Sequence, residues 1–174
     1  MDAQTRPCGQ ILATLSGWMH ASELARLTVH DDGTATGRLL DGQVSFMLAR
    51  PHQPPSLGML PDLDASIDRD TTIDASNLDD WTARFVAQTA APAAQRLHLG
   101  SRGQPLMDTD AGSWALLQPG PHGWRVRQGG SERIWDPIED HLLRSRHDGS
   151  PALNQFRITI TRDGGHSFSW SHTR

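Results

Sequence analysis

Short runs in which apolar and polar residues alternate dominate the first fifty positions of the chain. Such runs predict strands, because successive side chains of a strand point to opposite faces of a sheet. We expect strands at Gln10–Ser16, Leu24–His30, Thr34–Leu39 and Val44–Leu48. The turn Asp31-Asp32-Gly33 supports one of these hairpins, since glycine adopts the positive φ that tight turns need. A meander of this kind needs other parts of the chain against its apolar face.

The composition changes after Arg50, where prolines punctuate the chain. Proline lacks the amide donor and restricts the residue before it, so we expect no regular element here. The segment 51–73 is therefore predicted to cross from one part of the fold to another. Two interpretations stay open. It is a linker between two domains, or it is a loop that packs on a single domain through Leu57, Met59, Leu60 and Leu63.

Two helices are expected in the second half of the chain. Apolar residues at helical spacing predict the first at Asn77–Thr89, with Ser76 or Asp74 as its N-cap. The second carries markers of both ends: an N-cap acid, a proline at N1, an acid at N3 and a C′ glycine, at Asp136, Pro137, Glu139 and Gly149.

Further alternating runs add strands to both sides of the second helix. They lie at Gln95–Leu99, Ser113–Gln118, Trp124–Gln128, Gln155–Thr161 and His166–Trp170. We therefore predict an α+β fold with a mostly antiparallel, twisted or barrel-like sheet and two packed helices. Its parts are a strand meander at 1–50, the crossing segment at 51–73 and an α+β domain at 74–174, unless all three form one continuous domain.

Composition narrows the classes of function. The 174 residues suffice for one domain, or for one domain and a fragment of another. The formal net charge is −4, from 16 basic and 20 acidic residues without a long run of either sign, which argues against nucleic-acid binding. A single cysteine excludes an intrachain disulfide, the first residues lack the apolar core that a signal peptide would show, and no apolar run approaches membrane-spanning length. We expect a cytoplasmic protein that does not bind membranes.

No motif in the chain predicts catalysis. The glycine pairs Gly129-Gly130 and Gly164-Gly165 are typical of turns and do not follow the strand–glycine–helix pattern of a nucleotide site. The 9 histidines lack metal-ligand spacing, so no metal site is predicted. Neither Ser16 nor Cys8 lies in the context of an activated nucleophile.

Several stretches resemble a known family. The stretch Pro7-Cys8-Gly9-Gln-Ile-Leu, with the later Val44-Ser-Phe-Met, is similar to the last sheet segment of protein-L-isoaspartate O-methyltransferase-like enzymes. More closely, it resembles actinobacterial members that modify ribosomally made peptides. Similar stretches follow at Trp124–Gly130, Ile134–Glu139 and Phe156–Gly165. The resemblance covers almost the whole chain, but Cys8 stands where those enzymes have the first glycine of a Pro-Gly-Gly-like turn.

The resemblance implies a function without the usual cofactor. In those enzymes the part that binds S-adenosylmethionine precedes the Pro-Gly-Gly-like turn, so we expect this chain to bind no cofactor unless another protein completes the site. The expected role is a non-catalytic binding or scaffolding module for a peptide or a partner enzyme in a peptide natural-product pathway. The alternative is an enzyme, either half of a split carboxyl methyltransferase or a repurposed pocket that catalyses a cyclisation.

The resemblance also suggests where a partner binds. The ends of the opening strands lie near the active-site mouth of those enzymes, which makes Trp18, His20 and Arg50 candidate ligand-binding residues, together with Trp124 and Arg127. Arginines could pair with acidic side chains of a ligand, namely Arg26, Arg38, Arg50, Arg84, Arg125 and Arg127. The opening strands would leave a sheet edge uncovered, so we expect either a homodimer through them or cover by the segment 51–73.

Overall fold

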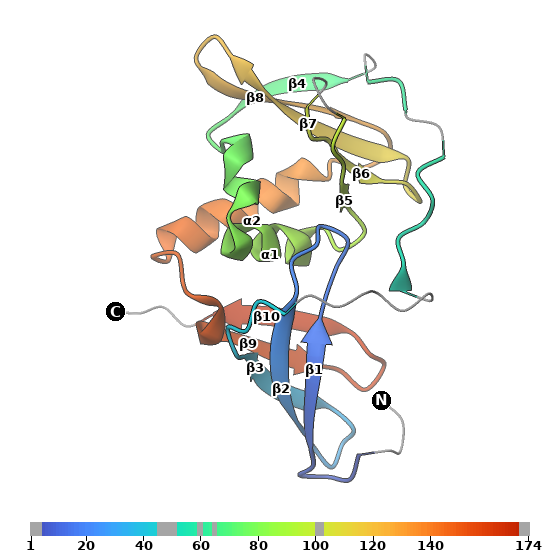
Figure 1. Cartoon of the computed structure of the whole chain (residues 1–174), viewed down its shortest axis with the longest axis vertical. Helices are drawn as coiled ribbons and strands as arrows, with labels where there is room; N and C mark the ends of the chain where they lie inside the picture. The colour runs from blue at the N-terminus through green and yellow to red at the C-terminus, as the bar shows by residue number, and fades with distance from the viewer. Residues whose placement is uncertain (1–4, 45–51, 59–60, 64–65, 100–102, 171–174) are drawn as a thin grey trace. The chain divides into compact units, whose positions relative to one another are not determined.

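The computed structural model describes residues 5–44, 52–58, 61–63, 66–99 and 103–170. The chain divides into two compact units. Unit 1 comprises Met1–Ser16, Ser22–Phe46 and Ser145–Arg174, and unit 2 comprises Gly17–Ala21 and Met47–Arg144. Each unit holds one five-stranded antiparallel sheet (Figure 1). The predicted α+β fold with two helices is confirmed, but the strands form two separate sheets and neither closes into a barrel.

The sheet of unit 1 joins strands from both ends of the chain. In spatial order its strands are β1 (Gln10–Leu15), β2 (Glu23–Val29), β3 (Ala35–Leu39), β9 (Phe156–Ile160) and β10 (His166–Trp170). The antiparallel pairing of β3 with β9 joins the strands from the two ends of the chain into one sheet. The five runs predicted near these positions are therefore confirmed as strands. Val44 lies outside any strand, and the rest of the predicted strand Val44–Leu48 lies outside the described residues.

One face of this sheet is apolar and buried. Leu27 on β2, Leu39 on β3 and the alternate residues Phe156, Ile158 and Ile160 on β9 are almost fully buried. The residues between them on each strand point to the opposite face, where most are exposed. This is the alternation of a sheet that has one covered face and one polar face.

The sheet of unit 2 is built around the predicted hairpin. Its strands in spatial order are β4 (Ile67–Thr71), β8 (Gly123–Gly129), β7 (Ser113–Gly120), β6 (Leu106–Asp108) and β5 (Gln95–Arg96). The hairpin of β7 and β8 confirms the strands expected at 113–118 and 124–128. The strand expected at Gln95–Leu99 is shorter, and β6 was not predicted.

Strand β4 lies inside the segment 51–73, for which no regular element was expected. Its sequence Ile-Asp-Arg-Asp-Thr contains one apolar residue and so lacks the alternation that marks a strand. Instead, Asp68 lies opposite Arg127 and Asp70 opposite Arg125 on the neighbouring strand β8. Opposite charges at cross-strand positions stabilise such a pairing, and this complementarity becomes visible only once the two strands are known to be neighbours.

Earlier parts of the same segment pack on unit 2. Leu63 contacts a buried cluster of Met107, Trp114 and Leu116 in the sheet. The side chain of Gln95 donates a hydrogen bond of 3.3 Å to the carbonyl of Pro55. Leu63 is one of the contacts that the loop interpretation named, but the choice between linker and loop stays a prediction. Met59 and Leu60 lie outside the described residues, and Leu57 is exposed.

The first predicted helix is two elements. A 3-10 helix, η2 (Ala75–Asp79), is followed by α1 (Trp81–Ala90). The extended backbone of Asp80 separates them, and its carboxylate accepts a 2.8 Å hydrogen bond from the amide of Ala83. Of the two predicted N-caps, Ser76 and Asp74, it is Asp74 that caps a helix, but it caps only η2, through the amide of Ser76. The prediction merged the two because their apolar residues continue at helical spacing.

The second helix, α2 (Trp135–His147), begins two residues earlier than the predicted first helical residue, Pro137. Asp136 lies in its first turn instead of at the N-cap, and its carboxylate binds side chains of the sheet. The prediction of a capping box that begins at Asp136 was therefore wrong. The C-terminal prediction is confirmed, because Gly149 has a positive φ of 85° and its amide, with that of Ser150, binds carbonyls of the last turn. A short 3-10 helix, η4 (Leu153–Gln155), then leads into β9.

The start of α1 at Asp80 predicts a specific effect on stability. Replacing Asp80 with alanine removes the acceptor for the Ala83 amide and should lower the free energy of unfolding by about 1 kcal/mol, whereas Asp80→Asn should cost much less. Urea unfolding followed by circular dichroism measures both. Equal effects of the two changes would show that α1 does not begin with this cap.

Candidate functional site

The loop Gly17–Ala21 carries two of the predicted ligand-binding residues and belongs to unit 2. The buried side chain of Gln88 on α1 fastens it. Its amide nitrogen donates to the carbonyl of Ala21 at 2.8 Å, and its oxygen accepts from the Ala21 amide at 3.3 Å. A Cβ at Gly17 would lie 2.3 Å from the Gln88 side chain, so any other residue there would displace Gln88 from its present position. The loop is therefore held in one conformation by a polar side chain that has both its groups engaged.

Trp18 and His20 differ in how this loop presents them. The indole N–H of Trp18 donates a 3.0 Å hydrogen bond to the carbonyl of His52, and the residue is half-buried. His20 is exposed, and its backbone has a positive φ of 62°. A residue with a Cβ pays about 1 kcal/mol or more for this left-handed conformation. Backbone strain of this kind persists only where the surrounding structure imposes it, and it is concentrated at functional sites.

Trp124 and Arg127 lie on opposite faces of β8, because they are an odd number of residues apart on one strand. Trp124 is half-buried on the face that carries Thr71, its cross-strand neighbour. Arg127 donates to the carbonyl of Leu63 at 2.7 Å and lies 3.4 Å from the carboxylate of Asp68. It thereby fastens the crossing segment to the sheet. Arg50 lies outside the described residues, so the role of this group as a ligand site stays a prediction.

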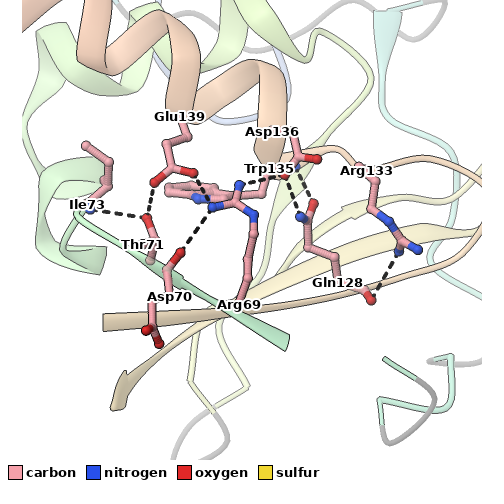
Figure 2. A network of polar contacts seen from close by, with 9 residues as sticks. All are labelled: Arg69, Asp70, Thr71, Ile73, Gln128, Arg133, Trp135, Asp136 and Glu139. Atoms are coloured by element: carbon pink, nitrogen blue, oxygen red, sulfur yellow. Dashed lines mark hydrogen bonds and ion pairs between the residues drawn. The ribbon is translucent and has the colours of Figure 1, made fainter. Parts of the chain in front are cut away.

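A network of polar side chains joins the sheet of unit 2 to the first turns of α2 (Figure 2). Arg69 on β4 is at its centre. One guanidinium nitrogen lies 2.6 Å from the carboxylate of Asp136, and another lies 2.5 Å from that of Glu139. Only 10% of the Glu139 side chain is exposed, compared with 46% for Asp136. One cation thus bridges two carboxylates on successive turns of the helix.

Two further side chains complete the network. The hydroxyl of Thr71 donates to Glu139 and accepts from the amide of Ile73 at 3.2 Å. Gln128 on β8 donates to Asp136 at 2.8 Å, and its oxygen accepts from the amide of Trp135, also at 2.8 Å. Gln128 therefore supplies the helix cap that the sequence assigned to Asp136.

The charges of this network stabilise each other. Burial raises the pKa of Asp136, but hydrogen bonds from Arg69 and Gln128 outweigh it and hold that pKa below its usual value. Burial likewise lowers the pKa of Arg69, and its bonds to Asp136 and Glu139 reverse the effect and raise it. Both groups stay charged near neutral pH. A general acid needs a raised carboxyl pKa, so this geometry suits cross-bracing better than proton transfer.

Outside this network, the pKa of Asp74 is also shifted, by hydrogen-bond donors close to it in the structure. The pKa of Asp74 is lowered chiefly by the amide of Ser76, with smaller contributions from the side chains of Ser76 and Trp124. Cys8 is exposed and forms no disulfide.

Within the described ranges, no group of three or more histidine, cysteine or acidic residues is arranged to hold a metal ion. No helix there is long and apolar enough to cross a bilayer.

The sequence of β4 carries a charge pattern that hydrophobic periodicity does not detect and that can be interpreted only once β8 is known to be its neighbour. The alternating charges Asp68-Arg69-Asp70 complement Arg125 and Arg127 when the two stretches lie antiparallel. Because β4 was not predicted, its Arg69 and Thr71 could not be placed opposite α2.

Comparison with family models, with curated proteins and with solved structures finds no match to this chain. The resemblance to isoaspartate methyltransferase-like enzymes therefore stays a prediction.

The lowered pKa of Asp136 gives a pH-dependent prediction. At pH 7, Asp136→Asn should lower the free energy of unfolding by about 0.5–1 kcal/mol, since half of this side chain is exposed and solvent weakens the pair. A carboxyl with a depressed folded-state pKa stabilises the fold above its unfolded value of about 3.9. The difference between wild type and variant should therefore be constant above about pH 5 and shrink as the pH falls further. Urea unfolding at several pH values measures it, and a difference that grows on acidification would contradict the ion pair.

Proposed function

We propose that this protein is a non-catalytic binding or scaffolding module for a peptide or a partner enzyme, acting in a peptide natural-product pathway. The observation that carries the proposal is the fastened loop Gly17–Ala21. It presents the exposed, strained His20 beside the half-buried Trp18. A loop that is already ordered loses little conformational entropy on binding, which favours affinity.

The polar network at α2 supports a binding role over the enzyme alternatives. The network contains two carboxylates, Asp136 and Glu139, on successive turns of α2. Arg69 forms an ion pair with each of them. In addition, Thr71 donates a hydrogen bond to Glu139 and Gln128 donates one to Asp136. Their geometry accounts for the attachment of α2 to the sheet without any need for a substrate.

Replacement of Trp18, the proposed aromatic anchor for the partner, is the first test of the proposal. Truncation of one buried aromatic anchor costs about 2 kcal/mol or more of binding energy. Trp18→Ala should therefore weaken binding to the peptide and enzyme products of the adjacent genes, measured by calorimetric titration, more than Arg127→Ala does. Arg127 serves as the comparison because its charged guanidinium group already binds Leu63, Ser66 and Asp68, whereas Trp18 contacts the same segment through its indole N–H to His52.

Circular dichroism of each variant checks that the fold is kept. Near-zero effects of both changes on binding would place the binding surface elsewhere. Micromolar binding of S-adenosylmethionine to the chain alone would favour the enzyme alternative.

The strain at His20 gives a second, sharper test. His20→Gly relieves the positive φ and should raise the free energy of unfolding by several tenths of a kcal/mol, while weakening partner binding because the imidazole is lost. Ser150→Gly is the matched control, since Ser150 has a positive φ of 53° and no proposed role. It should stabilise similarly and leave binding unchanged. If both variants bind like the wild type, His20 makes no contact with the partner.

A further inference from the structure

The exposed face of the unit 1 sheet carries three arginines in one cross-strand row. The strand register places Arg26 on β2 directly opposite Arg38 on β3, and Arg38 opposite Arg157 on β9. All three are exposed. Neighbouring strands lie about 4.8 Å apart, so their Cα atoms span about 10 Å. The row continues to Leu12 on β1 and to Ser169 on β10.

A second row of hydroxyl-bearing side chains runs beside the arginines. The register aligns Thr28, Thr36 and Thr159 across the same three strands, and extends the row to Gln10 and Ser167 at the edges. These short side chains leave the longer arginines standing above a low polar surface. Neither row contains an aspartate or a glutamate.

This arrangement opposes the stability of the sheet. Like charges directly opposite each other on neighbouring strands repel. Among the described residues, the side chains of Arg26, Arg38 and Arg157 form no ion pair and no hydrogen bond. The concentration of positive charge also stands out in a chain whose formal net charge is −4.

The sheet of unit 2 shows that this chain also uses arginine in the opposite way. There Arg125 faces Asp70 and Arg127 faces Asp68 across β8 and β4, so each cation meets an anion of its own sheet. The anions that would neutralise the unit 1 row are absent from its face in the part of the chain that the structure describes. A binding partner is the natural source of them.

We propose that this arginine row binds an acidic segment of a partner polypeptide. Alternate residues of an extended segment lie about 7 Å apart on one side, within reach of flexible arginine side chains. Guanidinium groups bind carboxylates through paired, charge-assisted hydrogen bonds. Thr28 and Thr159 supply hydroxyls for the segment's backbone, whereas the hydroxyl of Thr36 is hydrogen-bonded to His30 at 2.7 Å. Leu12, 63% exposed at the end of the arginine row, offers an apolar contact. This surface is distinct from the loop Gly17–Ala21, and the proposal does not depend on the role of that loop.

A nucleic acid fits the same face less well. Sheets that bind single strands stack bases on aromatic side chains. The aromatic residues of β9 and β10 point to the other face, where Phe156 and Trp170 pack with ring centroids 5.2 Å apart. On the arginine face, the described strands carry no aromatic residue. The arginines could bind phosphates, but the described strands offer no aromatic side chain on this face for bases to stack on.

Fluorescence anisotropy of the full chain with a labelled peptide of eight glutamates tests the proposal. At low salt the glutamate peptide should bind at least tenfold more tightly than a matched peptide of eight glutamines, and added salt should weaken it. Arg38→Gln, at the centre of the row, should weaken binding about fivefold or more. Arg162→Gln is the matched control, because Arg162 is exposed in the same unit and loses the same charge outside both rows. It should change binding less than twofold.

Unfolding and competition complete the experiment. The urea midpoint of Arg38→Gln should stay unchanged or rise, since the change removes like-charge repulsion, so lost binding cannot be ascribed to lost fold. Equal effects of Arg38→Gln and Arg162→Gln would overturn the proposal, as would equal binding of the two peptides. A labelled eight-residue oligothymidylate that binds more tightly than the glutamate peptide would assign the face to nucleic acid. Complete displacement by millimolar phosphate would reduce it to a site for small anions.

Discussion

The bridge that Arg69 forms between β4 and α2 is the interaction on which the arrangement of unit 2 depends. Strand β4 has almost no apolar surface of its own, so hydrophobic burial cannot hold it at the edge of the sheet. Its arginine instead binds two carboxylates of the helix, one of them nearly buried. Thr71 on the same strand donates to the other oxygen of Glu139. Gln128 on β8 donates to the Asp136 oxygen that Arg69 also binds and accepts from the amide of Trp135. A buried charge left without its partner is strongly destabilising, and this makes the members of the network mutually dependent.

The two sheets of this protein use charge in contrasting ways. In unit 2, charged residues at cross-strand positions are complementary, and they help to define which strands pair and in which register. In unit 1, apolar residues on the buried face define the pairing, and the charges on the open face are all of one sign along the arginine row. Burial of residues such as Leu27 and Ile158 outweighs the repulsion on the other side. A sheet face that is unfavourable for its own stability is a common feature of binding surfaces.

A similar conflict between local preference and the observed structure occurs in the loop Gly17–Ala21. The left-handed backbone of His20 would relax in an isolated peptide, but Gln88 holds the loop from α1. The strands on either side of the loop belong to unit 1, whereas the loop itself belongs to unit 2. The conformation of this candidate binding element is thus a property of residues far away in the sequence.

The sequence alone determined most elements that bury one face. The alternation at Gln155–Thr161 and the hairpin of 113–128 identify strands, and Gly149 ends α2, because burial and glycine conformation leave a local pattern. Tertiary structure decided what local patterns cannot encode. Strand β4 is held by charged partners on two other elements, Arg125 and Arg127 on β8 and the carboxylates of α2. The start of α2 is capped by Gln128 from β8. The arginine row has the same origin: Arg26 and Arg38 are neighbours through a hairpin, but Arg157 joins them only because β9 pairs with β3, a contact whose partners are far apart in the chain.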